Sequence, residues 1–205
     1  MTHDVPLHEL PWNPLSVAEA ADRFTVFPGR WWIAGGWAID LFIGRQTREH
    51  ADIGVLILRD DQRHLFNTLA GWEVHAAVMH KVLRLWSFGQ PFPPHVHDIW
   101  CRPTADAPWA LQVMLMDSRD DRWLFRRDSR IGGPIAALGQ ERDGVPFLTP
   151  EIQLLFKSKN PRPRDESDLT TALPAMSADQ IRSLLDALYL HDPDNPWIPE
   201  LSARL

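Results

Sequence analysis

The apolar positions along the chain follow two periods, and these periods predict its secondary structure. Short runs rich in β-branched and aromatic residues predict strands, of which the clearest lie at residues 31–34, 53–58, 72–76, 81–87, 95–101 and 109–116. A proline-rich and polar segment, residues 1–14, predicts an extended arm. The first helix is expected after Ser16, because Ser16 and Glu19 have the spacing of a capping box.

Near Pro150 the pattern changes from strands to helices. Three helices are predicted there, beginning near Pro150, Arg162 and Ser177. We therefore predict an α/β (α+β) chain with two parts. Residues 1–148 form a domain with a mixed, mostly antiparallel sheet flanked by helices, and residues 149–205 form a small helical region. Substrate is expected between them.

Composition narrows the class of protein. The chain has 205 residues, 44% of them hydrophobic and 23% charged, which is typical of a globular protein with a full core. No apolar run approaches the roughly 20 residues that cross a bilayer, and the first residues lack the basic and apolar regions of a signal peptide. We expect a cytoplasmic protein without a membrane partner. A single cysteine, Cys101, excludes an internal disulfide framework.

Charge and tryptophan content point to the kind of partner. The net charge of -6 argues against binding along a nucleic-acid backbone and agrees with a small cationic substrate. Some of the ten tryptophans are expected to line a pocket, because aromatic walls pack on sugar rings and cationic amines. The alternative is that the tryptophans belong to the hydrophobic core. We give this alternative at least equal weight for Trp31, Trp32, Trp37, Trp86 and Trp109.

Residues 31–58 carry the clearest chemical signal. They comprise an apolar strand, a Gly35–Gly36 turn, a short helix, a polar turn and a second apolar strand that begins at Asp52. This order brings backbone N–H groups at a helix N-terminus close to a carboxylate, as in proteins that hold a phosphate beside a divalent metal. The stretch predicts a nucleoside-triphosphate site. An ordinary strand-to-helix turn is the alternative reading of the two glycines taken alone.

The same stretch resembles a known motif. The resemblance lies in Gly35–Asp40, Gly44–Arg45, Thr47–Arg48 and His50–Ile53. These residues are similar to the opening motif of the aminoglycoside and lincosamide nucleotidyltransferases, a branch of the DNA-polymerase-β-like nucleotidyltransferase superfamily. The resemblance implies a nucleotidyltransferase-like fold, Mg²⁺ as the metal, and a nucleoside triphosphate, with ATP as the first choice, as the donor.

In that family the second strand carries two carboxylates separated by one residue. Side chains alternate along a strand, so such a pair lies on one face about 6.6 Å apart and suits a shared metal. Here the first acid is Asp52, but Gly54 stands at the second position. The resemblance also implies a third acid, which shares the metal or accepts the hydroxyl proton. Asp98 is the best match, and Gln112 is the alternative position.

The resemblance implies roles for further residues. Gly35 and Gly36 would cradle the phosphates, while Arg48 would brace this loop or bind phosphate. Lys157, or alternatively Lys159, would reach the triphosphate. Asp165 and Asp168 would either hold Arg164, face a substrate amine, or simply begin a solvated helix. His95 and His97 lie on the strand face opposite to Asp98, so this segment alone makes a poor metal site.

The function implied by the resemblance is modification of an antibiotic. A nucleoside monophosphate would pass from the triphosphate to a hydroxyl of an aminoglycoside-like or lincosamide-like substrate, with release of pyrophosphate, conferring resistance. The protein would act as a monomer or homodimer. Because of Gly54, three outcomes stay open: a one-metal enzyme completed by Glu49 or substrate groups, a phosphoryl transferase, or a protein that only sequesters the drug or nucleotide. A toxin–antitoxin role, or modification of protein or tRNA, is a separate alternative.

Overall fold

The computed structural model describes residues 4–6, 11–78 and 82–205. The chain divides into two compact units, each made of separated segments. The first unit contains residues 1–33 and 50–118, and the second contains residues 34–49 and 119–205. The predicted boundary after residue 148 falls inside the second unit, and the division into 1–148 and 149–205 stays a prediction. Within the described residues, no helix combines the length and apolar character needed to cross a membrane.

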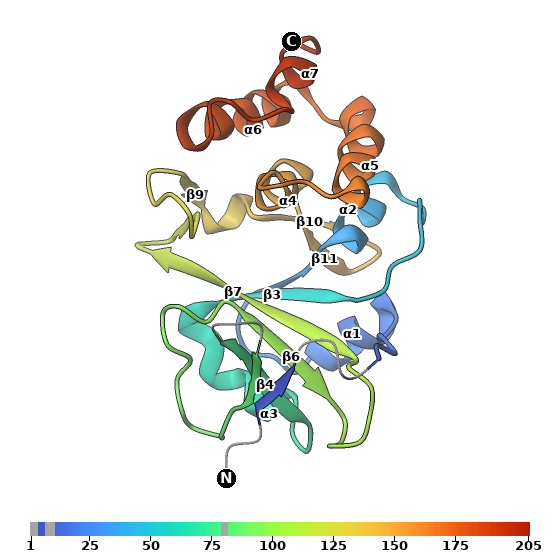
Figure 1. Cartoon of the computed structure of the whole chain (residues 1–205), viewed down its shortest axis with the longest axis vertical. Coiled ribbons are helices and arrows are strands. Elements are labelled where there is room, and N and C mark those ends of the chain that lie inside the picture. The colour runs from blue at the N-terminus through green and yellow to red at the C-terminus, as the bar shows by residue number, and fades with distance from the viewer. Residues whose placement is uncertain (1–3, 7–10, 79–81) are drawn as a thin grey trace. The chain divides into compact units, whose positions relative to one another are not determined.

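The first unit is built on a mixed sheet (Figure 1). Strands β3 and β7 pair in parallel, whereas β1–β5, β5–β4, β4–β6 and β6–β7 pair antiparallel. This architecture confirms the predicted mixed, mostly antiparallel sheet. The strands lie in the order β1 (Asp4–Pro6), β5 (Val82–Leu85), β4 (Glu73–Val78), β6 (Asp98–Arg102), β7 (Leu111–Arg119), β3 (Gly54–Leu58) and β2 (Trp31–Ala34).

Local signals explain the helices of the first unit. Helix α1 (Val17–Phe24) begins as predicted, with a capping box in which Ser16 accepts from the Glu19 N–H at 3.2 Å. After β3 the chain forms a 3₁₀ helix, η1 (Arg59–His64), followed by a short α3 (Leu65–Thr68). The chain then turns at Gly71, whose φ is +82°.

The strand predicted at residues 95–101 begins later, at Asp98. Arg59 explains the difference, because its guanidinium donates to the carbonyl of Pro93 at 3.3 Å and to that of Val96 at 2.9 Å. These bonds hold the segment before Asp98 as a loop. Residue 81, the predicted start of another strand, lies outside the described residues, and β5 is described from Val82.

The second unit combines helices with two short antiparallel hairpins. In one hairpin β8 pairs with β9, and in the other β10 pairs with β11. The second of these hairpins turns at Asp143 and Gly144. The elements are α2 (Gly36–Ile43), β8 (Arg122–Leu124), β9 (Gly132–Pro134), η3 (Ile135–Ala137), β10 (Gly139–Arg142), β11 (Val145–Leu148), α4 (Pro150–Lys157), α5 (Pro163–Ala172), η4 (Leu173–Ala175), α6 (Ala178–His191) and α7 (Ile198–Ser202).

The helices after Pro150 confirm the predicted change of pattern. Helix α6 starts with a capping box in which Ser177 accepts from the N–H of Gln180 at 3.2 Å. Beyond α6 the chain packs back on its unit through Trp197, which is 2% exposed and donates to Glu166 at 2.9 Å. The hydrophobic core of this unit therefore includes Trp197, at the start of the last helix, α7.

Candidate active site

One face of the first unit's sheet carries the predicted acids. On β6, buried Ile99 and Cys101 alternate with half-exposed Asp98 and Trp100. On β7, buried Leu111, Val113 and Leu115 similarly flank the half-exposed Gln112 and Met114. Because successive side chains point to opposite faces of a sheet, the half-exposed residues share the face away from the core. We call this the acidic face.

Strand register fixes the neighbours across this face. Gly54 pairs with Gln112, and Gln112 in turn pairs with Trp100. Asp52 lies two residues before Gly54, on the side opposite to the fully buried Ile53. The Ile53 carbonyl accepts from the Gln112 N–H at 2.9 Å, which extends the parallel ladder to this segment. By this alternation Asp52 and Asp98 lie on the same face, and their binding of a shared metal stays a prediction.

Gln112 contacts the predicted third acid directly. Its side-chain amide Nε2 donates to Asp98 Oδ1 at 3.0 Å. This bond runs diagonally between β7 and β6, because Asp98 itself pairs with Met114. Sequence order alone left Asp98 and Gln112 as alternatives for one position. The structure makes them partners, with the carboxylate on Asp98 and a neutral amide beside it.

The acidic face offers two carboxylates as possible metal ligands. Two carboxylates, Asp52 and Asp98, share the face, while Gly54 supplies no side chain. Within the described parts of the chain, no group of three or more histidine, cysteine, aspartate or glutamate side chains is arranged to hold a metal. Mg²⁺ is commonly held by one or two carboxylates together with water and substrate phosphates. The residues therefore fit a single Mg²⁺ completed by the nucleotide, and they do not supply the acids of a two-metal centre.

The second unit holds the predicted phosphate-binding turn. Gly35 precedes α2 with φ +77° and ψ −148°, a conformation open essentially only to glycine. No atom lies within 4 Å of the position that a Cβ would occupy, so the turn also leaves space on that side. The Gly35 N–H donates at 2.7 Å to Oε1 of Gln153, a side chain of α4 that is 5% exposed. Gln153 was not predicted, because it is distant in the sequence.

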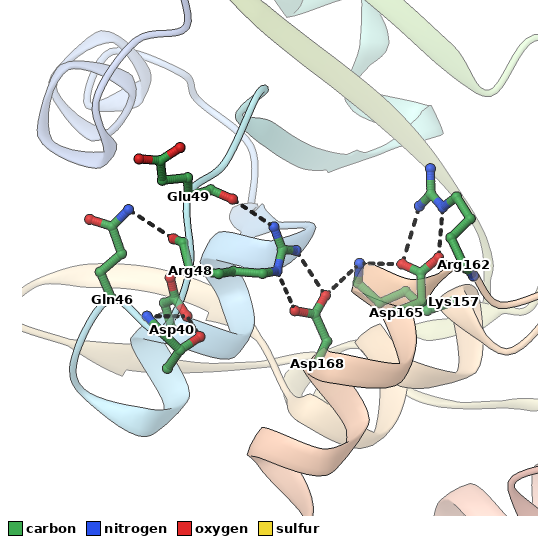
Figure 2. A network of polar contacts seen from close by, with 9 residues as sticks. Asp40, Gln46, Arg48, Glu49, Lys157, Arg162, Asp165 and Asp168 are labelled. Carbon is green, nitrogen blue, oxygen red and sulfur yellow. Dashed lines mark hydrogen bonds and ion pairs between the residues drawn. The ribbon is translucent and has the colours of Figure 1, made fainter.

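Arg48 and Lys157 belong to a network of ion pairs in the same unit (Figure 2). The Arg48 guanidinium binds both oxygens of Asp168, at 2.7 and 3.0 Å, and also donates to the Glu49 carbonyl at 3.0 Å. The Lys157 ammonium lies 2.9 Å from Asp168 and 2.9 Å from Asp165. Arg162 completes the network at Asp165, at 2.7 Å.

The network sets the charge state of its acids. Asp165 and Asp168 are each 2% exposed. Burial alone would raise the pKa of Asp168, but the hydrogen bond from Arg48 and the charge of Lys157 outweigh it and hold this pKa below its ordinary value. For Asp165, burial is likewise outweighed by the hydrogen bonds from Arg162 and Lys157, which lower its pKa strongly. Both acids are therefore ionised, with Lys157, Arg162 and Arg48 as their partners in place of the predicted Arg164.

The predicted phosphate-binding residues are thus brought together within the second unit. Lys157 follows Gln153 by four residues on α4, so both lie on one face of that helix. Gln153 contacts Gly35, and Lys157 shares Asp168 with Arg48. Asp40 supports the same loop, because its carboxylate accepts from the N–H of Thr47 at 3.1 Å. Direct binding of phosphate by these groups stays a prediction.

Comparison with known proteins identifies the family. The family model described as aminoglycoside-2''-adenylyltransferase matches residues 16–171. The chain belongs to the aminoglycoside-2''-adenylyltransferase family. Its first unit carries the two acids, its second carries the glycine turn, and the predicted nucleotidyltransferase is confirmed at the level of the family. Among curated proteins, no sequence matches this chain.

Solved structures show the same fold at low sequence identity. The lincosamide antibiotic adenylyltransferase LnuA, bound to lincomycin, matches with a TM-score of 0.55 and 18% identity over 80% of this chain and 100% of its own. ANT(2'')-Ia in complex with adenylyl-2''-tobramycin matches with a TM-score of 0.51 and 17% identity, over 82% of this chain and 90% of its own. The solution structure of ANT(2'')-Ia matches with a TM-score of 0.53 and 18% identity, over 85% of this chain and 88% of its own.

Proposed function

We propose that this protein transfers a nucleoside monophosphate from a nucleoside triphosphate, with ATP as the first candidate, to a hydroxyl of an aminoglycoside-like antibiotic. A lincosamide is the second acceptor class. The observation that carries the proposal is the placement of Asp52 and Asp98 on one sheet face of a chain from this family. The need for a triphosphate agrees with the predicted cytoplasmic location.

Asp52 and Asp98 would hold Mg²⁺, with triphosphate oxygens completing the ligand set. When bound, the ion neutralises charge that develops on the phosphates. Asp98 would also accept the proton of the attacking hydroxyl, with its carboxylate oriented by the hydrogen bond from Gln112. The hydroxyl oxygen forms a bond to the α-phosphorus, the bond from that phosphorus to the bridging oxygen breaks, and pyrophosphate leaves. Both roles of Asp98 are part of the proposal.

The second unit, taken by itself, carries the residues that would bind phosphate. Gly35 and Gly36 allow the backbone to approach the phosphates closely at the start of α2. Lys157 and Arg48 contribute positive charge, which Asp165 and Asp168 fix in place. In this proposal Gln153 keeps the Gly35 peptide in its unusual conformation, so that the turn is formed before the nucleotide arrives.

Mass spectrometry tests the proposal. Purified protein is incubated with Mg²⁺, mixed nucleoside triphosphates and a panel of aminoglycosides and lincosamides. A mass gain equal to one nucleoside monophosphate on a drug identifies donor and acceptor together. A gain of one phosphate contradicts the proposal in favour of phosphoryl transfer. No gain, with drug binding still measured by calorimetry, favours the sequestering protein, for which Gly54 is the chemical reason.

A further inference from the structure

The acidic face continues beyond Asp98 into an aromatic surface. Trp100 lies two residues after Asp98 on β6, which places the two Cα atoms about 7 Å apart on one face. Register puts Trp100 between Gln112 of β7 and His75 of β4. Trp100 is half-buried, so part of its side chain is exposed on the face that carries the proposed catalytic acid.

Trp12 extends this surface from the N-terminal segment. Its ring centroid lies 4.9 Å from that of Trp100, at an interplanar angle of 63°. Backbone bonds hold the segment in place: the Asn13 N–H donates to the Trp109 carbonyl at 2.9 Å, and the Trp109 N–H donates to the Pro11 carbonyl at 3.0 Å. Trp12 is also half-exposed. The two rings therefore form an edge-to-face pair whose positions are fixed by the main chain.

A buried cluster packs beside the pair. Trp109 is fully buried, with its ring centroid 5.6 Å from that of Trp100. The Arg102 guanidinium lies 4.7 Å from the Trp109 ring, and the Glu73 carboxylate binds Arg102 at 2.8 Å. The His75 ring packs edge-on against Trp109 at 5.0 Å. Because these contacts fix Trp109, they restrict Trp100 as well, and little ordering is needed when a ligand binds.

The surroundings indicate what the surface binds. Aromatic faces attract cations and pack on the C–H faces of sugar rings. Asp98 and Asp52 add negative charge on the same side of the sheet, which favours a protonated amine. We propose that Trp100 and Trp12 form the surface on which a protonated amino-sugar ring of the acceptor rests, beside Asp98. This inference rests on the proposed function, and it selects a cationic aminoglycoside over a lincosamide.

Isothermal titration calorimetry on the full chain tests the assignment, with tobramycin and Mg²⁺–ATP titrated separately. Trp100→Leu and Trp12→Leu should each raise the tobramycin Kd, by about 10-fold for Trp100, and leave the Kd of Mg²⁺–ATP within twofold. Trp100→Phe keeps an aromatic ring and should raise the tobramycin Kd by less than Trp100→Leu does. Trp86→Leu is the matched control, because Trp86 is half-buried and stacks on Phe92 outside this surface. Wild-type protein should bind tobramycin more tightly than lincomycin.

The outcomes separate this inference from the proposed function. Unchanged tobramycin affinity in both Trp100→Leu and Trp12→Leu, in a wild type that modifies the drug, overturns the aromatic surface alone. A selective loss of Mg²⁺–ATP affinity assigns the surface to the nucleobase and also overturns the inference. A wild type that neither binds nor modifies tobramycin or lincomycin overturns the proposed function and the inference together. Trp12 lies outside the strands of the sheet, so Trp12→Leu tests the surface even if Trp100→Leu fails to fold.

Discussion

At the scale of single residues, Gly54 decides the chemistry of the acidic face. Gly54 lies on β3 and pairs with Gln112 of β7, so no side chain from β3 lies next to Gln112 on this face. Gln112 instead turns its amide toward Asp98. The result is a face with two carboxylates and one neutral donor, which in the proposed function would hold a single divalent ion together with the nucleotide.

Substitutions at the acids test this chemistry. We expect Asp52→Asn to abolish Mg²⁺-dependent transfer, because it removes one of two carboxylate ligands. Gly54→Asp should strengthen binding of Mn²⁺, measured by electron paramagnetic resonance without nucleotide, because it adds a third acid on the same face. Full transfer activity in Asp52→Asn would show that another residue holds the metal. Unchanged Mn²⁺ affinity in Gly54→Asp would show that the geometry no longer suits the added acid.

Gly35 provides a second test at this scale. A Cβ in its backbone conformation costs about 1–3 kcal/mol, so Gly35→Ala should lower the free energy of unfolding by that amount in urea titrations and weaken ATP binding. Gly71→Ala is the control, since Gly71 also has a positive φ of 82° and open space around it. It should lose stability but keep its ATP affinity. Equal ATP affinities in the two variants would show that Gly35 has no specific role in nucleotide binding.

At the scale of elements, the ion-pair network ties three parts of the second unit together. It links the loop after α2 through Arg48, the end of α4 through Lys157, and α5 through Asp165 and Asp168. Its acids are almost fully buried, so each charge depends on its partners. The elements that carry the predicted phosphate ligands are therefore held by contacts that the sequence motif does not contain.

Removing one acid should be costly. We expect Asp168→Asn to lower the free energy of unfolding by about 3 kcal/mol, because it leaves Arg48 without its carboxylate partner and Lys157 with only one. Asp179→Asn breaks the exposed pair with Arg182 and should cost less than about 0.5 kcal/mol. Urea unfolding at neutral pH measures both. Equal, small losses in the two variants would mean that the buried network contributes no more than a surface pair.

The network also predicts acid sensitivity. The pKa values of Asp165 and Asp168 are lowered in the folded protein, whereas an aspartate in the unfolded chain has a pKa of about 3.9. Their contribution to stability is therefore fully present above the unfolded pKa and is lost as the pH falls through the folded values. The free energy of unfolding should decrease below about pH 4, and Asp168→Asn should show a smaller decrease. Identical pH profiles would contradict this.

At the scale of the whole molecule, net charge connects the composition to the substrate. The chain carries a net charge of -6, which attracts a polycationic drug over a distance set by the Debye length. Raising the salt concentration from about 0.05 to about 0.5 M should raise the tobramycin Kd several-fold. Lincomycin, with fewer amino groups, is the control and should change less. A tobramycin Kd independent of salt would mean that long-range attraction does not contribute.

Much of the fold was predictable because its signals are local. Capping boxes at Ser16 and Ser177, the Gly35–Gly36 turn and the alternation along β7 each depend on residues close together in the chain. The strand start at Asp98 was predicted three residues too early. That error has a tertiary cause, because Arg59, almost 40 residues away, binds the preceding carbonyls.

The sequence by itself determined the family motif and the order of most strands and helices, because both depend on residues close together in the chain. The resemblance also singled out Asp52 and Asp98, whose roles stay predictions. Only the tertiary structure decided which distant groups meet. Gln153 at the Gly35 turn, Asp168 between Arg48 and Lys157, and Trp12 against Trp100 are pairs far apart in the chain. Such contacts depend on strand register and helix packing, which neighbouring residues do not encode.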